Sequence, residues 1–312
     1  MRYIGELREG EMLSENYFCK VKQSLKTKAG KTYYSLILQD KTGTLDAKVW
    51  DLGPGIDHFE SMDYIHIDGQ VTSFQNSLQL NIKRIRKCQE GEYDPKDFMP
   101  VTDKNIEEMY RSLLGYIERM TNPHVKKLAE SFFKDDQDFA RRFKNHSAAK
   151  SVHHGFIGGL LEHTLSVVNL CNYLADQYPL NRDVLLACAM FHDIGKLEEL
   201  SPFPENDYTD EGQLLGHIII GSQQVAARIA TIPGFPKKLA GEIIHCILSH
   251  HGELEYGSPK KPATMEALAL SYADNTDAKL QTMKEALAAG EEKAEWVGYN
   301  RFFETNIKRS SK

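Results

Sequence analysis

The sequence predicts an α+β chain of two parts, a small five-stranded β-barrel followed by an all-α domain. Two observations lead to this fold class. In residues 1–88, apolar and polar side chains alternate in several short segments, as they do in half-buried strands. From residue 103 onward, apolar side chains recur at spacings of three and four, as they do on one face of a helix. The length of 312 residues is enough for about two domains.

Five strands are predicted in the first part. Turns at Asp40–Gly43 and Gln75–Ser77 connect neighbouring strands, because both segments are rich in residues that turns prefer. The predicted strands cover residues 17–21, 33–39, 44–50, 64–71 and 78–82. Short strands at this spacing indicate a small barrel, and the OB-fold is the five-stranded barrel that fits. We therefore expect residues 1–88 to be an OB-fold domain that binds single-stranded nucleic acid.

A linker and a helical domain are predicted after the barrel. Residues 89–102 are polar, contain two prolines and show no periodicity, which is typical of a linker. Residues 103–312 are the predicted all-α domain, in which Asn122 followed by Pro123 is typical of a helix N-terminus. The predicted helices cover residues 106–120, 123–134, 158–177, 182–194, 213–231, 236–250 and 262–288, and residues 201–212 are a predicted loop.

The composition is that of a globular protein in a reducing compartment. Hydrophobic residues make up 41% of the chain and charged residues 26%. The sequence contains no run of 18 apolar residues and no apolar leader, so we expect neither a membrane span nor secretion. The five cysteines are widely spaced and odd in number, which argues against a disulfide framework or a zinc ribbon. These features predict a cytoplasmic protein.

Basic and aromatic residues on the barrel are candidate contacts to nucleic acid. Residues 1–88 carry a net charge of +2 and the remainder −8, a small excess that favours binding of a polyanion by the barrel. Since aromatic residues in a small barrel usually fill its core, we expect only some of them to stack on bases. The aromatic candidates are Phe18, Tyr33, Tyr34, Trp50 and Phe74, of which Tyr33, Trp50 and Phe74 are assigned to substrate binding. The candidate phosphate contacts are Lys20, Lys22, Lys48, Lys83, Arg84 and Arg86.

Histidines and aspartates in the second part predict a metal site. His192 and Asp193 are adjacent in FHDIGK, where the predicted helix ends, and Gly195 is expected to stop that helix. An aspartate at a helix C-terminus is disfavoured by the helix dipole, so a cation nearby would explain it. A lone histidine such as His163 is usually structural, but His163, His192-Asp193 and Asp274 on helices that pack together indicate ligands. Mixed nitrogen and oxygen ligands suit Mn, Fe, Co, Ni or Zn, and such an ion can activate water.

The pattern of these residues resembles that of the HD-domain metal-dependent phosphohydrolases, over about residues 145–285. The residues that follow the H…HD…D pattern are His163, His192, Asp193 and Asp274. The residues that match the extended pattern of two-metal HD domains are His217, His250 and His251. An OB-fold ahead of an HD domain, with the stretches HHGFIGGLLEHTLSV and FHDIGK, is similar to the YhaM-type 3′→5′ exoribonucleases of Gram-positive bacteria.

The resemblance implies hydrolysis of single-stranded RNA from its 3′ end to nucleoside monophosphates, with single-stranded DNA and a homo-oligomer left open. It implies two divalent ions bridged by Asp193, with Mn as the expected metal and Co, Fe, Ni, Zn or Mg as alternatives. Asp193 and Lys196 are the expected catalytic residues, and the Lys196 ammonium can also contact a phosphate as a point charge. His154 is a candidate substrate contact or a capping residue. Asp277 follows Asp274 by one helical turn, where it binds substrate, orients a ligand histidine or caps a helix.

Two other functions are consistent with the same motifs. The first is a phosphohydrolase of nucleotides or cyclic nucleotides, because an HD fold does not fix the substrate. A barrel that binds single-stranded nucleic acid argues against this function, because a nucleotidase does not need one. In addition, HHGELEYG lacks the GYP triplet that would indicate cyclic-di-GMP as substrate. The second is a DNA-binding replication or regulatory factor with a vestigial metal site. The complete set of ligand residues argues against that function.

Overall fold

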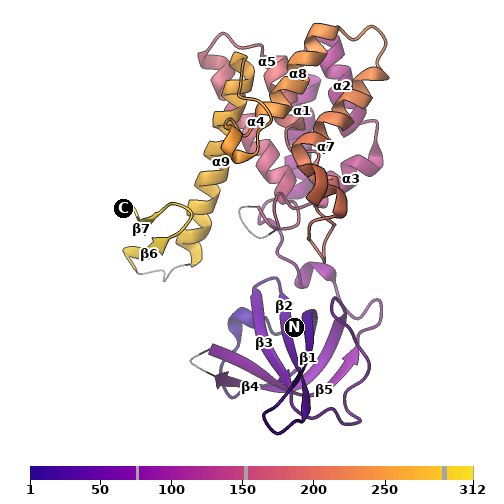
Figure 1. Cartoon of the computed structure of the whole chain (residues 1–312), viewed down its shortest axis with the longest axis vertical. Coiled ribbons are helices and arrows are strands. Elements are labelled where there is room, and N and C mark those ends of the chain that lie inside the picture. Colours follow the sequence, from indigo (N-terminus) through magenta and orange to yellow (C-terminus); the bar gives the residue numbers. More distant parts are fainter. Residues whose placement is uncertain (75–76, 151–153, 290–293, 312) are drawn as a thin grey trace. The chain divides into compact units, whose positions relative to one another are not determined.

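The computed structural model describes residues 1–74, 77–150, 154–289 and 294–311. The chain divides into two compact units, each of which is described here by itself (Figure 1). One unit comprises Met1–Val101 with Phe203–Glu205, and the other comprises Thr102–Pro202 with Asn206–Lys312. Gln75 and Asn76 of the predicted turn, and His153 next to the candidate His154, lie outside the described residues.

The first unit is a closed five-stranded barrel, as the sequence predicts. Its strands follow the order β1-β2-β3-β5-β4, in which only the β3–β5 pairing is parallel. This is the Greek-key barrel of an OB-fold. The strands are β1 (Met12–Lys26), β2 (Thr32–Asp40), β3 (Gly43–Val49), β4 (Tyr64–Phe74) and β5 (Ser77–Lys87).

Alternation of side chains builds the barrel core. In β4, Ile65, Ile67 and Val71 point inward and are fully buried. Gly69 shares this inward face at an irregularity in the pairing with β5, where a Cβ would lie 2.7 Å from the carbonyl oxygen of Asn81. Glycine is therefore required at this position for the two strands to approach.

The segment predicted as a linker packs on the barrel instead. Phe98 and Met99 are each 1% exposed, and the Gln39 side-chain amide donates to the Phe98 carbonyl at 3.1 Å. The rings of Tyr64 and Tyr93 stack with centroids 3.8 Å apart. The polar composition of residues 89–102 obscures these few apolar contacts, which extend the compact unit to Val101.

The second unit consists mainly of helices. Its helices are α1 (Ile106–Glu118), α2 (Pro123–Phe133), α3 (Gln137–Asn145), α4 (Gly159–Gln177), α5 (Arg182–Phe191), α6 (Lys196–Glu199), α7 (Asp210–Ala230), α8 (Lys237–Ser249) and α9 (Met265–Ala289). As expected, the Asn122 side chain caps α2 by accepting from the backbone N–H groups of His124 and Val125. The sequence did not indicate α3, α6 or the terminal hairpin of β6 (Trp296–Asn300) and β7 (Thr305–Lys308).

Helix α5 lies at the centre of the helical core. Every residue from Val184 to Phe191 is buried, which is typical of a helix surrounded by others on all sides. Its contacts are mainly with α2, α4, α8 and α9. All five cysteines are buried and free, and within the described ranges no helix is long and apolar enough to cross a membrane.

Candidate metal centre

His192 and Asp193 follow the buried helix α5 directly and are themselves buried. Gly195 has φ −62°, so it does not end the helix through a left-handed conformation as expected. Its role is close packing, because a Cβ at Gly195 would lie 2.1 Å from the His217 carbonyl oxygen and 2.6 Å from the Gly221 nitrogen. The missing side chain lets α7 approach, which brings His217 next to Asp193.

Asp193 faces two separate groups of histidines with its two carboxylate oxygens. Oδ2 lies 3.4 Å from the Nε2 atoms of both His163 and His192. Oδ1 lies 3.4 Å from Nε2 of His217 and 3.7 Å from Nε2 of His250. One carboxylate therefore stands between two sets of ligand atoms, the arrangement that a bridge between two ions requires.

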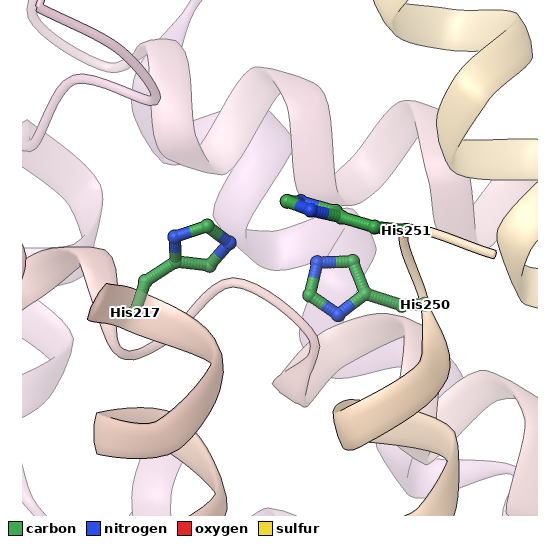
Figure 2. Close-up of side chains that lie close together, drawn as sticks. All are labelled: His217, His250 and His251. Carbon is green, nitrogen blue, oxygen red and sulfur yellow. The ribbon is translucent and has the colours of Figure 1, made fainter. Parts of the chain in front are cut away.

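Each set holds three residues whose ligand atoms lie within 4.8 Å of one another. The first set is His163 on α4, His192 after α5 and Asp274 on α9, and Nε2 of His163 lies 3.2 Å from Oδ1 of Asp274. The second set is His217, His250 and His251, whose rings gather from α7 and the end of α8 in Figure 2. The structure thus brings together all seven residues that the sequence marks as metal ligands.

All five ligand histidines are held at Nδ1, which leaves Nε2 directed inward. Main-chain carbonyls accept from three of them at 2.7–2.8 Å: Ala189 from His192, Ile247 from His250 and Tyr256 from His251. Carboxylates accept from the other two, Asp277 from His163 at 2.7 Å and Glu199 from His217 at 2.9 Å. Such outer partners fix the tautomer and the ring orientation of a metal-binding histidine.

Buried polar atoms in the centre lack partners that a cation would supply. Asp193 Oδ1, His217 Nε2 and His250 Nε2 are buried, and none has a hydrogen-bond partner among the described residues. Buried polar groups are seldom left unsatisfied, because losing water without a replacement costs free energy. Imidazole nitrogens and carboxylate oxygens are ligands for a divalent transition metal, so the residues fit such an ion.

The protonation states also favour a cation at the centre. Burial and then neighbouring imidazoles lower the pKa values of His192, His250 and His251, so these rings are neutral near pH 7. Burial opposes ionisation of Asp193, but the Lys196 ammonium first, and then the neighbouring histidines, hold its pKa well below the usual range. Burial opposes protonation of His163, yet hydrogen bonds to Asp274 and Asp277 raise its pKa to about 10. A metal ion would displace that proton.

The three expected polar contacts near the ligands have different positions. Lys196 lines the same cavity as Asp193 and pairs with its Oδ2 at 2.7 Å. His154 and Asp277, both described, do not line that cavity. Asp277 accepts from Ser166 and His163 and lies 3.1 Å from Nε2 of the buried His154. This geometry places both behind His163 and supports the orienting role of Asp277, not direct contact with substrate.

Two glutamates, Glu162 buried and Glu199 partly buried, have contacts that the sequence analysis did not anticipate. Glu199 binds the ring and the backbone N–H of His217 because Gly216, with φ 73°, kinks α7 there. Glu162 is 5% exposed and binds Thr102 and Lys104. No local pattern marks either residue, since each acts on a partner distant in the sequence.

The barrel aromatics separate into core and surface. Phe18 is fully buried and so belongs to the core. Tyr33 and Trp50 stack with ring centroids 4.6 Å apart, and 45% of Trp50 is exposed. Phe74 is 60% exposed, whereas Tyr34 is half-buried with the Lys22 ammonium 4.8 Å from its ring centroid. Tyr33, Trp50 and Phe74 therefore remain candidates for stacking on bases.

The HD domain family model matches residues 160–279, which contain the seven candidate ligands. The 3′-5′ exoribonuclease YhaM of Geobacillus sp. (strain WCH70) is 38% identical over 266 residues, covering 83% of this chain and 79% of that protein. The chain belongs to the YhaM family. An HD domain implies a divalent metal, in agreement with the ligand set of this family member.

Two solved structures are similar to part of this YhaM-family chain. The second OB-fold domain of replication protein A from Methanococcus maripaludis has 20% identity and a TM-score of 0.24, covering 30% of this chain and 98% of its own. A replication protein A heterotrimer bound to ssDNA has 16% identity and a TM-score of 0.22. The match covers 27% of this chain and 62% of the chain in that structure.

Proposed function

We propose that this chain is a metal-dependent 3′→5′ exoribonuclease that degrades single-stranded RNA to nucleoside monophosphates. Membership of the YhaM family supports the activity and its direction. The observation that carries the proposal is the position of Asp193, whose two oxygens face two separate sets of ligand atoms. Paired ions are common in enzymes that cleave phosphodiesters.

One ion would be held by His163, His192 and Asp274. The other would be held by His217, His250 and His251, and Asp193 would contact both ions. A bound ion would supply an activated water and stabilise charge on the phosphate. Lys196 keeps Asp193 ionised, and its remaining N–H donors can reach a phosphate oxygen in the shared cavity. Manganese is the proposed ion, because the family resemblance implies it and the mixed imidazole and carboxylate ligands accept it along with Fe, Co, Ni or Zn.

In this proposal the barrel binds the single-stranded nucleic acid and the helical unit hydrolyses it. Exposed Trp50, its neighbour Tyr33, and Phe74 would stack on bases. Every proposed metal ligand belongs to the helical unit, which would make hydrolysis of a very short substrate independent of the barrel. A cytoplasmic location remains a prediction, and the sequence leaves the choice between RNA and DNA open.

The test is incubation of the protein with 5′-labelled single-stranded RNA in Mn, Mg or EDTA, resolved on a sequencing gel. A Mn-dependent ladder that shortens from the 3′ end is expected. RNA that stays intact in every metal contradicts the proposal, and nucleotides would then be tested as substrates of a phosphohydrolase. A matched single-stranded DNA of the same sequence measures the preference for the sugar.

A further inference from the structure

The cavity at the metal centre is lined by polar metal-ligand residues and also by an apolar wall that contains two aromatic residues. Its volume is about 520 Å³, within the range of cavities that bind small molecules. Metal ligands and Lys196 supply its polar part. Tyr256, Ala278 and Phe302 supply an apolar part, with Asn275 and Lys279 beside them. A ligand with both an anionic group and a flat apolar group would match this lining.

Both aromatic residues of this wall have accessible side chains. Tyr256 is 65% exposed and Phe302 is 56% exposed. Neither ring is therefore occupied in filling the core of the helical unit. Their exposure leaves aromatic surface available to a ligand in the same cavity that contains Asp193 and Lys196.

The chain ties both aromatic residues to elements that carry metal ligands. Tyr256 ends a short 3₁₀ helix, and its carbonyl accepts from Nδ1 of His251 at 2.8 Å. Phe302 lies in the turn of the β6–β7 hairpin, where its N–H donates to the Asn300 side chain at 2.9 Å. Arg309 at the end of the hairpin donates to the Leu287 carbonyl in α9, the helix that holds Asp274. The aromatic wall is thus connected to the metal centre at two points.

We propose that Tyr256 and Phe302 form a subsite that stacks on the 3′-terminal nucleobase of the RNA. This inference rests on the proposed exonuclease function. The scissile phosphate would lie at the metal ligands while Lys279 stabilises negative charge nearby. Stacking suits an enzyme that removes residues one after another, because every base has a π-face and the contact tolerates any sequence.

The test compares two 5′-labelled RNAs that differ only at the 3′ end, one with a normal nucleotide and one with an abasic ribose. For the wild-type enzyme, kcat/KM of the first cleavage should fall roughly five-fold or more on the abasic RNA, as expected for one lost stacking contact. Phe302→Ala should lower kcat/KM on the normal RNA and leave the abasic RNA unaffected. Equal wild-type rates on both RNAs would overturn the inference.

Two further substitutions separate stacking from packing of the hairpin. Phe302→Trp keeps an aromatic face and should retain discrimination between the two RNAs. Phe302→Leu keeps apolar bulk without that face and should behave as Phe302→Ala. A Leu variant that discriminates as well as the wild type would show that the residue acts only through packing, against the proposal.

A matched control lies on the same hairpin. Tyr299 is 64% exposed and does not line the cavity described here, so Tyr299→Ala should leave the discrimination unchanged. Loss of discrimination in that variant would assign the effect to the hairpin as a whole and overturn the role of Phe302. If the wild-type enzyme shortens neither RNA in Mn, the exonuclease function itself fails, a result distinct from equal cleavage of both.

Discussion

The carboxylate of Asp277 accepts a hydrogen bond from Nδ1 of His163 at 2.7 Å and thereby sets which nitrogen of that ring faces Asp193. A carboxylate can only accept, so Nδ1 carries a proton, and once a metal ion has displaced the second proton Nε2 offers its lone pair. Nε2 of His163 lies 3.2 Å from Asp274 and 3.4 Å from Asp193. Asp277 thus acts on the metal centre through His163.

Replacing Asp277 with asparagine should lower the affinity of the proposed site at His163, His192 and Asp274 for its metal ion. Loss of an outer partner of a ligand histidine typically lowers metal affinity about 10- to 100-fold. A calorimetric titration of the metal-free protein with Mn measures this change in affinity without relying on activity. Asp138→Asn is the control, because Asp138 pairs with Arg141 on the surface and should leave the titration unchanged. Unaltered Mn affinity in Asp277→Asn would refute the orienting role.

Replacing Asp193 with alanine should abolish hydrolysis while RNA binding persists, because the barrel is untouched. The loss should exceed about ten-fold in rate, since metal-ion catalysis is worth several kcal/mol. The substitution leaves the partly buried Lys196 without its partner, so Asp193→Asn serves as a second variant of nearly the same shape. Gel assays and RNA-binding titrations give the two readouts. A variant that keeps more than a tenth of the wild-type rate would contradict the bridging assignment.

Replacing Gly195 with alanine should destabilise the helical unit and displace His217. The added Cβ would overlap the His217 carbonyl and the Gly221 nitrogen, and overpacking of this kind costs about 1–3 kcal/mol. Gly241→Ala is the contrasting variant, because its Cβ would meet nothing within 4 Å on the exposed side of α8. It should stabilise the protein by about 0.5–1 kcal/mol. Urea unfolding measures both, and equal effects would argue against the packing role of Gly195.

Replacing Trp50 with alanine should weaken binding of long single-stranded RNA without slowing hydrolysis of a dinucleotide. Loss of one stacked base costs about 1–3 kcal/mol of binding free energy. Fluorescence anisotropy with RNA in EDTA measures the affinity, and dinucleotide turnover in Mn measures the chemistry. Tyr178→Ala, at an exposed tyrosine of the helical unit, is the control. Parallel losses on both substrates would contradict the division of labour.

The parts of the fold that sequence analysis predicted are those with regular apolar spacing. Alternation in β4 and the run of apolar residues in α5 each leave a local signal, and both elements are found. Helix α3 was missed because it has few apolar residues among many charged ones, with Phe139 and Phe143 supplying its buried face. Residues 89–102 were predicted to be a linker because Phe98 and Met99 are isolated within a polar segment.

For the site, the sequence indicated the candidate metal ligands and offered Asp277 as an orienting partner, but it did not mark Glu199. His192 and Asp193 are recognisable because their types and adjacency match the chemistry of an ion. Glu199 has no such signature, since its function depends on the His217 imidazole that it contacts in space. For Asp277 the sequence left three roles open, and its contact with His163 favours the orienting one. Gly195 was assigned to a helix end, whereas the tight approach of α7 decides its identity.

Three of the five imidazole anchors are main-chain carbonyls, those of Ala189, Ile247 and Tyr256. These rings are thus held by main-chain groups at helix ends and in a short loop, not by mobile side chains. Loading a preorganised site requires little ordering of side chains, so the entropic cost of binding is small. Ions should therefore exchange in the folded protein, and the identity of the bound metal would follow the supply of competing ions in the cell.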